Sequence, residues 1–313
     1  MQLLLDVAEV PAADFEALRL KVEGDFCFNT LHNSLAFCRA GLLKRTELRV
    51  WRAARGPLEA YGVVHVIGGQ SNRIVLESNS YDPAFTIPAT DALAARIYEV
   101  VRDHHFLFIY TTEITMALQL EKNFAAQKSH PHKWLEERNI VYFADKKQRE
   151  MFVQMEIQLP EGFRFDELKA EDFAEILKDQ SCQRPGVDPE AMRDRLSAYP
   201  SAAVYHENGE LACYQSLCGL GYISPRYTRC KYRFSGLCAP VEQLVARKCW
   251  TEFGIVPAKS VAIQSKCALE FADRSPFWTK FTCPKGCAVL KQYLILARDP
   301  GHRMEFFESC INW

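Results

Sequence analysis

The stretch that decides the fold is Tyr227-Thr-Arg-Cys-Lys-Tyr-Arg-Phe-Ser-Gly-Leu-Cys238. It ends a segment, 220–228, whose aromatic and β-branched residues predict a strand. From position 237 onward, apolar residues at 237, 241, 244, 245 and 249 recur with a helical period. Pro240 fits the first turn of that helix, where its missing N–H costs little. The stretch is therefore predicted to be the turn between a strand and a helix.

The pattern Arg233-x-x-Gly236-x-Cys238 has features that suit a bound phosphate. The first N–H groups of a helix have no partner within it, and they carry the positive end of its dipole. Gly236 has no Cβ to hold a diphosphate away from the backbone. Arg229, Lys231 and Arg233 are expected to add positive charge to the same turn. The alternative interpretation is a solvated basic loop followed by an ordinary helix.

The stretch resembles motif A of the GNAT superfamily of acyl-CoA-dependent acyltransferases, in which Arg or Gln is followed after two residues by Gly. Arg233 and Gly236 match this pattern, and Cys238 replaces the small residue that usually ends it. Four further segments are similar to the C-terminal half of glycine N-acyltransferase-like proteins, most of all the nematode ones. They are Arg195-Leu-Ser-Ala-Tyr-Pro-Ser-Ala-Ala-Val-Tyr205, Glu207-Asn-Gly-Glu-Leu-Ala-Cys-Tyr214, Pro257-Ala-Lys-Ser-Val-Ala-Ile263 and Ser275-Pro-Phe-Trp-Thr279.

This resemblance covers residues 140–297 and implies an α/β protein with a GNAT-type mixed sheet flanked by helices. It implies two GNAT-like halves in tandem, and the length of 313 residues fits two domains of ~150 residues. The predicted parts are a degenerate half at 1–145, a linker region at 146–162 and an acyl-CoA-binding half at 163–313. Apolar residues within 146–162 also alternate as in a strand.

Hydrophobic periodicity gives the elements of each half. In the first half, helices are predicted at 12–21, 31–43, 90–102 and 114–127, and strands at 48–51, 61–67, 73–77, 106–110 and 140–143. Thr90 is the predicted N-cap of the third helix. In the second half, helices are predicted at 170–178, 188–198 and 267–273, and strands at 163–165, 201–205, 211–217, 260–264, 277–281 and 288–296.

The resemblance also implies where acyl-CoA binds. The pantetheine arm would lie between the strands 223–228 and 260–264, and the diphosphate over the amides of residues 234–238. A small amine or amino acid would attack the thioester directly, without a covalent intermediate on the enzyme, so the protein must orient the reactants and accept a proton. The predicted cofactor-binding residues are Tyr227, Thr228, Arg233, Phe234, Ser235, Gly236, Leu237 and Cys238.

The chain departs from its family at the general base. The family carries an acid just after the strand that follows motif A, and Lys266 occupies that position here. A protonated Lys cannot accept the amine proton, so Glu270 becomes the candidate base. The spacing of Lys266 and Glu270 equally predicts an ion pair on a helix surface. We therefore expect weak glycine conjugation, and a non-catalytic acyl-CoA-binding or interaction protein is the alternative.

Composition limits the partners. The net charge is −1, so the whole chain has no electrostatic case for nucleic acid or an anionic membrane, and no run of 18 apolar residues occurs. The N-terminal residues do not resemble a secretory or an Arg-rich transit signal. A cytoplasmic location is expected, although the family resemblance also allows a mitochondrial one. The oligomeric state stays open.

The twelve cysteines are scattered and are expected to be reduced thiols. Cys283 and Cys287 flank a predicted hairpin turn and lack the further ligands that a zinc site needs. His104-His105 is interpreted as structural and His130-Pro-His132 as a solvated turn. The sequence predicts no metal.

Overall fold

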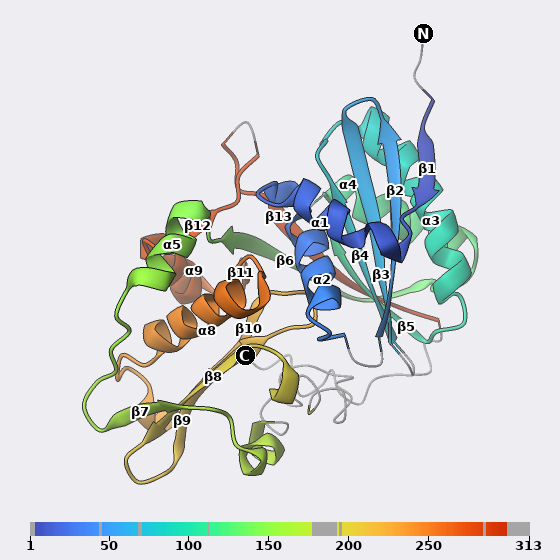
Figure 1. Cartoon of the computed structure of the whole chain (residues 1–313). Coiled ribbons are helices and arrows are strands. Elements are labelled where there is room, and N and C mark those ends of the chain that lie inside the picture. The colour runs from blue at the N-terminus through green and yellow to red at the C-terminus, as the bar shows by residue number, and fades with distance from the viewer. Residues whose placement is uncertain are drawn as a thin grey trace. The chain divides into compact units, whose positions relative to one another are not determined.

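The computed structural model describes residues 4–43, 46–67, 71–111, 113–176, 193, 196–283 and 286–298. The chain divides into two compact units (Figure 1). Unit 1 combines Met1–Phe143 with Ser260–Gly301, and unit 2 contains Ala144–Lys259. Each unit has its own sheet and its own buried core.

The sheet of unit 1 follows the order β1-β2-β3-β4-β5-β13-β6-β11, and β12 pairs with β6. Strands β4 and β5 are parallel, whereas β13 is antiparallel to both β5 and β6. A strand from the last part of the chain therefore lies between two strands of the first part. The strands are β1 (Asp6–Glu9), β2 (Thr46–Arg55), β3 (Leu58–Ile67), β4 (Ser71–Ser78), β5 (Phe106–Thr111), β6 (His132–Phe143), β11 (Ala258–Ala262), β12 (Thr279–Lys280) and β13 (Leu290–Ala297).

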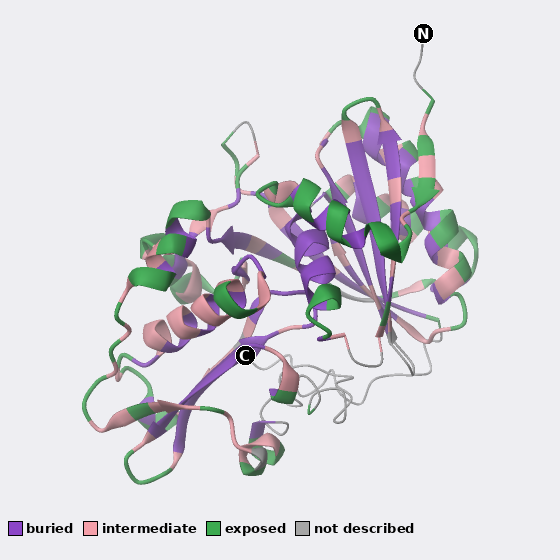
Figure 2. Ribbon diagram, viewed as in Figure 1, coloured by how far each residue is buried: buried purple, intermediate pink, exposed green. Residues whose placement is uncertain are grey.

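Helices cover both faces of this sheet (Figure 1). On one face, α3 (Pro83–Val101) and α4 (Ile114–Ala126) bury a core with alternate strand residues. A Cβ added at Gly62 would lie 3.1 Å from the Ile97 side chain, so glycine lets α3 approach β3 closely. On the other face are α1 (Phe15–Val22) and α2 (Asn29–Arg39). The central strands are buried along most of their length (Figure 2).

Unit 2 contains a four-stranded antiparallel sheet in the order β10-β9-β8-β7. Its strands are β7 (Phe163–Asp166), β8 (Ser201–His206), β9 (Leu211–Leu217) and β10 (Ile223–Thr228). The long helix α8 (Cys238–Phe253) packs on β8, β9 and β10, and α5 (Lys146–Gln154) packs on α8. The predicted Asn-Gly hairpin joins β8 to β9, with Gly209 at φ 87°.

Two predicted element boundaries are wrong. Helix α3 begins at Pro83 with Asp82 as N-cap, and Thr90 lies buried inside it. Residues 146–154 form α5 rather than a strand or linker, because Asp145 and Gln148 form a capping box in which each side chain bonds the other residue's N–H. Local capping thus prevails over the alternation of apolar residues.

The compact units also differ from the predicted halves. Residues 260–301, predicted to belong to the second half, cluster with unit 1 because β13 pairs with β5 and β6. The predicted helices at 170–178 and 188–198 lie partly outside the described residues, within which η3 (Ala170–Asp172) and helical residues 173–176 and 196–198 are seen.

Candidate cofactor-binding turn

The predicted strand, turn and helix lie within unit 2 in the predicted order. Strand β10 ends at Thr228, the 3-10 turn η4 spans Cys230–Tyr232, and α8 begins at Cys238. The backbone between η4 and α8 has φ of 66° at Phe234 and 78° at Gly236. Positive φ is uncommon for a residue such as Phe234, whose side chain is fully exposed and gains no packing from it.

The sign of φ alternates along this segment, since Leu237 has φ −75° and Ser235 is not among the positive-φ residues. Such alternation turns successive N–H groups into a concave nest that suits an anion. Within the described residues, the N–H groups of Gly236 and Leu237 make no hydrogen bond. Leu237, the N-cap of α8, provides no side-chain cap either. The start of α8 therefore presents open donors at the positive end of a helix dipole.

The backbone conformation at position 236 favours glycine, whereas there is enough space for a larger residue. An added Cβ would meet only the Pro160 side chain, at 3.6 Å, which is ordinary van der Waals contact. The positive φ is what disfavours other residues there. Close approach of a phosphate to this glycine stays a prediction.

The expected positive charge of the turn is largely neutralised, which corrects the sequence-based expectation. Arg229 pairs with both Glu175 and Glu210, and Lys231 also pairs with Glu210. Lys231 is the main reason that the pKa of Glu210 falls to about 2. Arg233 donates to the main-chain carbonyl of Thr228 at 3.3 Å and has no carboxylate partner among the described residues. Arg233 is therefore the cation of this turn that an anionic ligand could recruit.

Helix α8 is fixed at its other end. Gly254 adopts the left-handed conformation of a C-cap, and the N–H of Ile255 reaches back to Cys249 in a Schellman-type closure. Arg247 donates to the main-chain carbonyls of Phe152, at 2.6 Å, and of Met155, which terminate α5. The open turn thus begins a helix that is held firmly within unit 2.

A buried ionic cluster lies between α8 and the strands next to it. Glu242 accepts from Lys259 at 2.7 Å and from Arg226 at 3.2 Å. Burial lowers the pKa of Lys259, and the carboxylate of Glu242 opposes that shift. Sequence reasoning missed this cluster. A Glu next to Val241 on the apolar face of the predicted helix was the signal that could have revealed it.

Strand β10 ends the order of the four-stranded sheet, and the residue before it, Tyr222, makes an isolated parallel bridge with Ala258. The side chain of Tyr227 packs against the buried cluster around Tyr214, on the face away from Arg226, and the role of this residue in binding the cofactor arm stays a prediction. Only its main-chain groups remain candidates for binding the arm.

The two catalytic candidates lie on α9 (Lys266–Arg274), which belongs to unit 1. Both Lys266 and Glu270 are exposed. Glu270 pairs with Arg274 at 3.4 Å, not with Lys266 as its spacing suggested. Asp273 accepts from Tyr142 and pairs with Lys280, both at 2.7 Å. The roles of Lys266 and Glu270 stay predictions.

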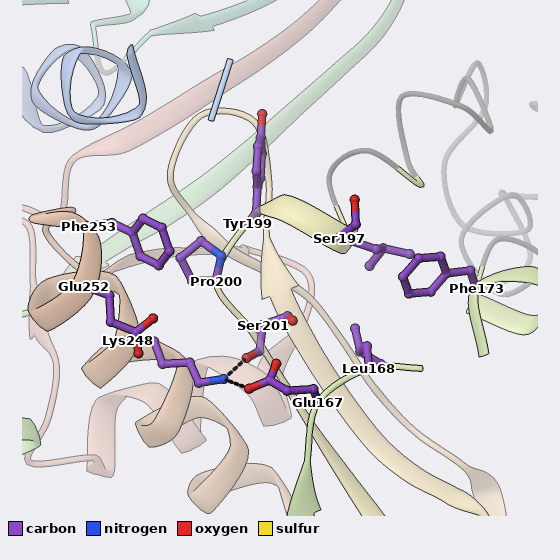
Figure 3. Close-up of a pocket in the computed structure, with 11 residues that line it drawn as sticks. Glu167, Leu168, Phe173, Ser197, Tyr199, Pro200, Ser201, Lys248, Glu252 and Phe253 are labelled. Carbon is purple, nitrogen blue, oxygen red and sulfur yellow. Dashed lines mark hydrogen bonds and ion pairs between the residues drawn. The ribbon is translucent and has the colours of Figure 1, made fainter. Parts of the chain in front are cut away.

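A cavity of about 460 Å³ lies in unit 2 away from the turn (Figure 3). Within it, the Lys248 ammonium bridges Glu167 at 2.6 Å and the carbonyl of Ser201 at 3.0 Å. Lys248 is ten residues along α8 from Cys238, roughly 15 Å of helix rise. The cavity therefore contains none of the predicted cofactor-binding residues. Its lining is Glu167, Leu168, Phe173, Leu196, Ser197, Tyr199, Pro200, Ser201, Lys248, Glu252 and Phe253.

In the part of the chain that the structure describes, no group of three or more His, Cys, Asp and Glu side chains could hold a metal ion. No helix within that part is both long enough and apolar enough to cross a membrane. The main chain of Cys283 and Cys287 closes the predicted hairpin turn, with the N–H of Cys283 donating to the carbonyl of Cys287 at 2.8 Å.

Comparison with solved structures finds proteins that align with this chain over most of their length. An X-ray structure of a Drosophila melanogaster protein from a structural genomics consortium aligns with a TM-score of 0.68 at 12% identity, over 93% of this chain and 98% of the other. A tandem GNAT protein from the clavulanic acid biosynthesis pathway aligns with a TM-score of 0.48 at 12% identity, over 95% and 99% of the two chains. A GCN5-related N-acetyltransferase from Sphaerobacter thermophilus gives 0.48 at 10% identity, over 95% and 96%.

No family model matches the chain, and no curated protein matches it. At these identities the likeness concerns the fold alone. The predicted α/β class is confirmed: the chain has a mixed sheet flanked by helices and divides into two compact units, while the GNAT assignment stays a prediction.

Proposed function

We propose that unit 2 binds acyl-CoA, with the diphosphate over the amides of residues 234–238. The observation that carries this proposal is the open turn before α8, where the sign of φ alternates at Phe234 and Gly236 and the N–H groups of Gly236 and Leu237 have no hydrogen-bond partner among the described residues. Arg233 supplies a cation beside these donors, and charge-assisted hydrogen bonds to phosphate are stronger than neutral ones. The main-chain groups of Tyr227 and Thr228 on β10 would hold the pantetheine arm as an added strand.

The reaction that this fold supports best is transfer of the acyl group to a small amine or amino acid, as in glycine N-acyltransferase-like proteins. The amine nitrogen forms a bond to the thioester carbonyl carbon, and the carbon–sulfur bond breaks. The CoA thiolate leaves and takes up a proton, while a base accepts the proton that the amine loses. An amide and free CoA are the products.

This mechanism needs a base that accepts the amine proton. Glu270 lies on an exposed helix face and is paired with Arg274, so it is not held ready to accept a proton. This observation favours a second candidate function, an acyl-CoA-binding protein that does not catalyse transfer. An acceptor that arrives as a neutral amine would avoid the need for a base.

Two measurements separate these functions. Calorimetry with CoA and short-chain acyl-CoAs tests binding, and mass spectrometry of the amide formed with glycine tests transfer without interference from protein thiols. We expect binding with little glycine conjugation, and a Lys266→Glu variant should conjugate glycine faster, because general-base catalysis contributes roughly 10²–10⁴-fold. Absence of CoA binding by folded protein would refute the proposed function. Efficient wild-type conjugation that is unchanged in Lys266→Glu and Glu270→Gln would refute the assignment of the base.

A further inference from the structure

Two thiols and one hydroxyl meet beneath the first turn of α8. Cys213 on β9 lies directly opposite Thr228 on β10 in the strand register. The hydroxyl oxygen of Thr228 is 3.1 Å from the sulfur of Cys213 and 3.4 Å from the sulfur of Cys238. A single hydroxyl therefore contacts both sulfurs of a cysteine pair that is separated by 25 positions in the sequence.

The charges around this pair distinguish its two members. Cys238 is the first residue of α8, at the positive end of the helix dipole. The hydrogen bond from Cys213 and the positive charge of Arg226 hold the pKa of Cys238 well below its usual range, against the opposing effects of burial and Glu242. The same contact and burial raise the pKa of Cys213. Lys259, from β11, pairs with Glu242 rather than adding free charge to the pair.

Access also differs between the two sulfurs. Cys213 is fully buried, whereas Cys238 is half-buried. Elsewhere, burial is the main cause that raises the pKa of Cys27, Cys38 and Cys249, which makes those thiols poorer nucleophiles at neutral pH. The arrangement thus pairs a partly exposed cysteine, whose surroundings favour its thiolate form, with a buried cysteine.

We propose that Cys238 and Cys213 form a dithiol redox site that reacts with small disulfides such as glutathione disulfide. The Cys238 thiolate attacks one sulfur of the disulfide, forms a mixed disulfide, and expels one small thiolate, which is then protonated. Cys213 then attacks the sulfur of Cys238, forming the Cys213–Cys238 bond and expelling the second small thiolate, which takes up the proton that Cys213 gives up. Two protein thiols are oxidised and one disulfide is reduced to two thiols.

This bond would change the turn before α8. A disulfide requires Cβ atoms about 3.5–4.5 Å apart, so it would tie the first residue of α8 to β9. The amides of Gly236 and Leu237 precede that residue directly. Oxidation should therefore weaken CoA binding, an expectation that rests on the proposed function, whereas the thiol chemistry does not.

The thiol chemistry is tested on the full-length protein by incubation with glutathione disulfide, alkylation of the remaining thiols and peptide mapping. We expect a linked Cys213–Cys238 peptide. Cys213→Ala should leave glutathione attached to Cys238, and Cys238→Ser should leave Cys213 unmodified. Cys230→Ser is the matched control, because Cys230 lies nearby in η4 but outside the pair. Thermal unfolding verifies that each variant folds.

The pH profile gives a second, independent readout in wild-type protein. The alkylation rate of Cys238 should level off below pH 7, whereas that of an ordinary exposed thiol rises about tenfold per pH unit up to its pKa. A missing Cys213–Cys238 peptide, or a Cys238 alkylation rate that rises about tenfold per pH unit through pH 7, overturns the proposal. If CoA fails to bind even the reduced protein while the linked peptide forms, only the proposed function falls.

Discussion

Among single residues, Glu210 sets the charge balance of the turn before α8, because it pairs with both Arg229 and Lys231. Arg233 and Gly236 could be identified from a short motif because the strand before them and the helix after them have clear periods. The neutralisation of Lys231 by Glu210 could not, because it depends on how the β8–β9 hairpin places Glu210 beside η4. The approach of Cys213 and Cys238 to the Thr228 hydroxyl could not be predicted either, since cross-strand register places Cys213 opposite Thr228.

Replacing Gly236 by Ala tests the turn directly. The substitution should weaken CoA binding about 10–100-fold, because a hydrogen bond to a charged group contributes ~1.5–3 kcal/mol and the strained backbone misplaces these donors. Gly209→Ala is the matched control: it has φ 87° in the β8–β9 hairpin of the same unit and open space around its Cα. Calorimetry should find its CoA affinity unchanged, although both variants should lose similar stability. Equal affinities in the two variants would remove the turn from the site.

His130 provides a residue-scale prediction for unit 1. It is buried, not solvated as the sequence suggested: Nε2–H donates to the carbonyl of His104 at 2.8 Å, and Nδ1 accepts from Ser129 at 2.7 Å. Burial lowers its pKa to about 4. In the unfolded chain His130 takes up a proton at its ordinary pKa, near 6.5, whereas in the folded chain it does so only near pH 4. The stability that neutral, buried His130 contributes is therefore complete above pH 6.5 and is lost as the pH falls towards 4.

The test compares urea unfolding of wild type and His130→Asn at several pH values. As the pH falls from 6.5 to 4, the free energy of unfolding of the wild type should decrease by about 1.4 kcal/mol per pH unit more than that of His130→Asn, because the wild type takes up one extra proton on unfolding. Parallel curves for the two proteins would show that His130 is protonated in the native state.

At the scale of elements, periodicity found nearly every helix and strand, and capping chemistry set the ends. The sequence predicted that α3 starts at Thr90, and the structure has Pro88 inside this helix. The helix nevertheless continues through Pro88, because Arg55 donates at 3.0 Å to the Ala84 carbonyl that Pro88 cannot bond. The true start is Asp82, whose carboxylate accepts from the N–H of Ala84 at 2.9 Å.

Asp82 also bears on which unit binds the cofactor. In unit 1, a strand, β4, also precedes a helix, α3, but there the Asp82 carboxylate accepts from the N–H of Ala84 in the first turn of the helix and would repel a phosphate. Asp82→Ala should therefore cost about 1 kcal/mol of stability and leave CoA affinity unchanged. Asp145→Ala, which removes the cap of α5, is the comparison in unit 2. Chemical denaturation and calorimetry measure both effects, and a loss of CoA binding in Asp82→Ala would assign the cofactor to unit 1.

For the whole molecule, the sequence predicted a division into two parts. It did not predict that β13, from the last part of the chain, pairs with β5 and β6 of unit 1. Sequence periodicity assigns β13 correctly as a strand, yet nothing local in residues 290–297 selects its neighbours. Its neighbours are β5 and β6, whose paired residues lie about 150–190 positions earlier in the chain. Lys291 on this strand donates at 3.1 Å to the Thr30 hydroxyl, close to the buried carboxylate of Glu77. Backbone register and a buried polar contact thus bind the last part of the chain to unit 1.

The pairing of β13 with β5 and β6 predicts how the protein behaves when its chain is cut between Phe143 and Ala144. The fragment 1–143 lacks the strand that pairs with β5 and β6, so two hydrophobic strand edges are exposed and the fragment should aggregate alone. Co-expressed with 144–313, it should be recovered as a complex when only one fragment carries an affinity tag. Ile295→Lys, at a buried position of β13, should abolish recovery, and Lys280→Ala on the surface-lying β12 should not. Isolation of soluble, cooperatively unfolding fragment 1–143 by itself would show that β13 is dispensable to unit 1, and the two halves would then be independent domains as the sequence alone suggested.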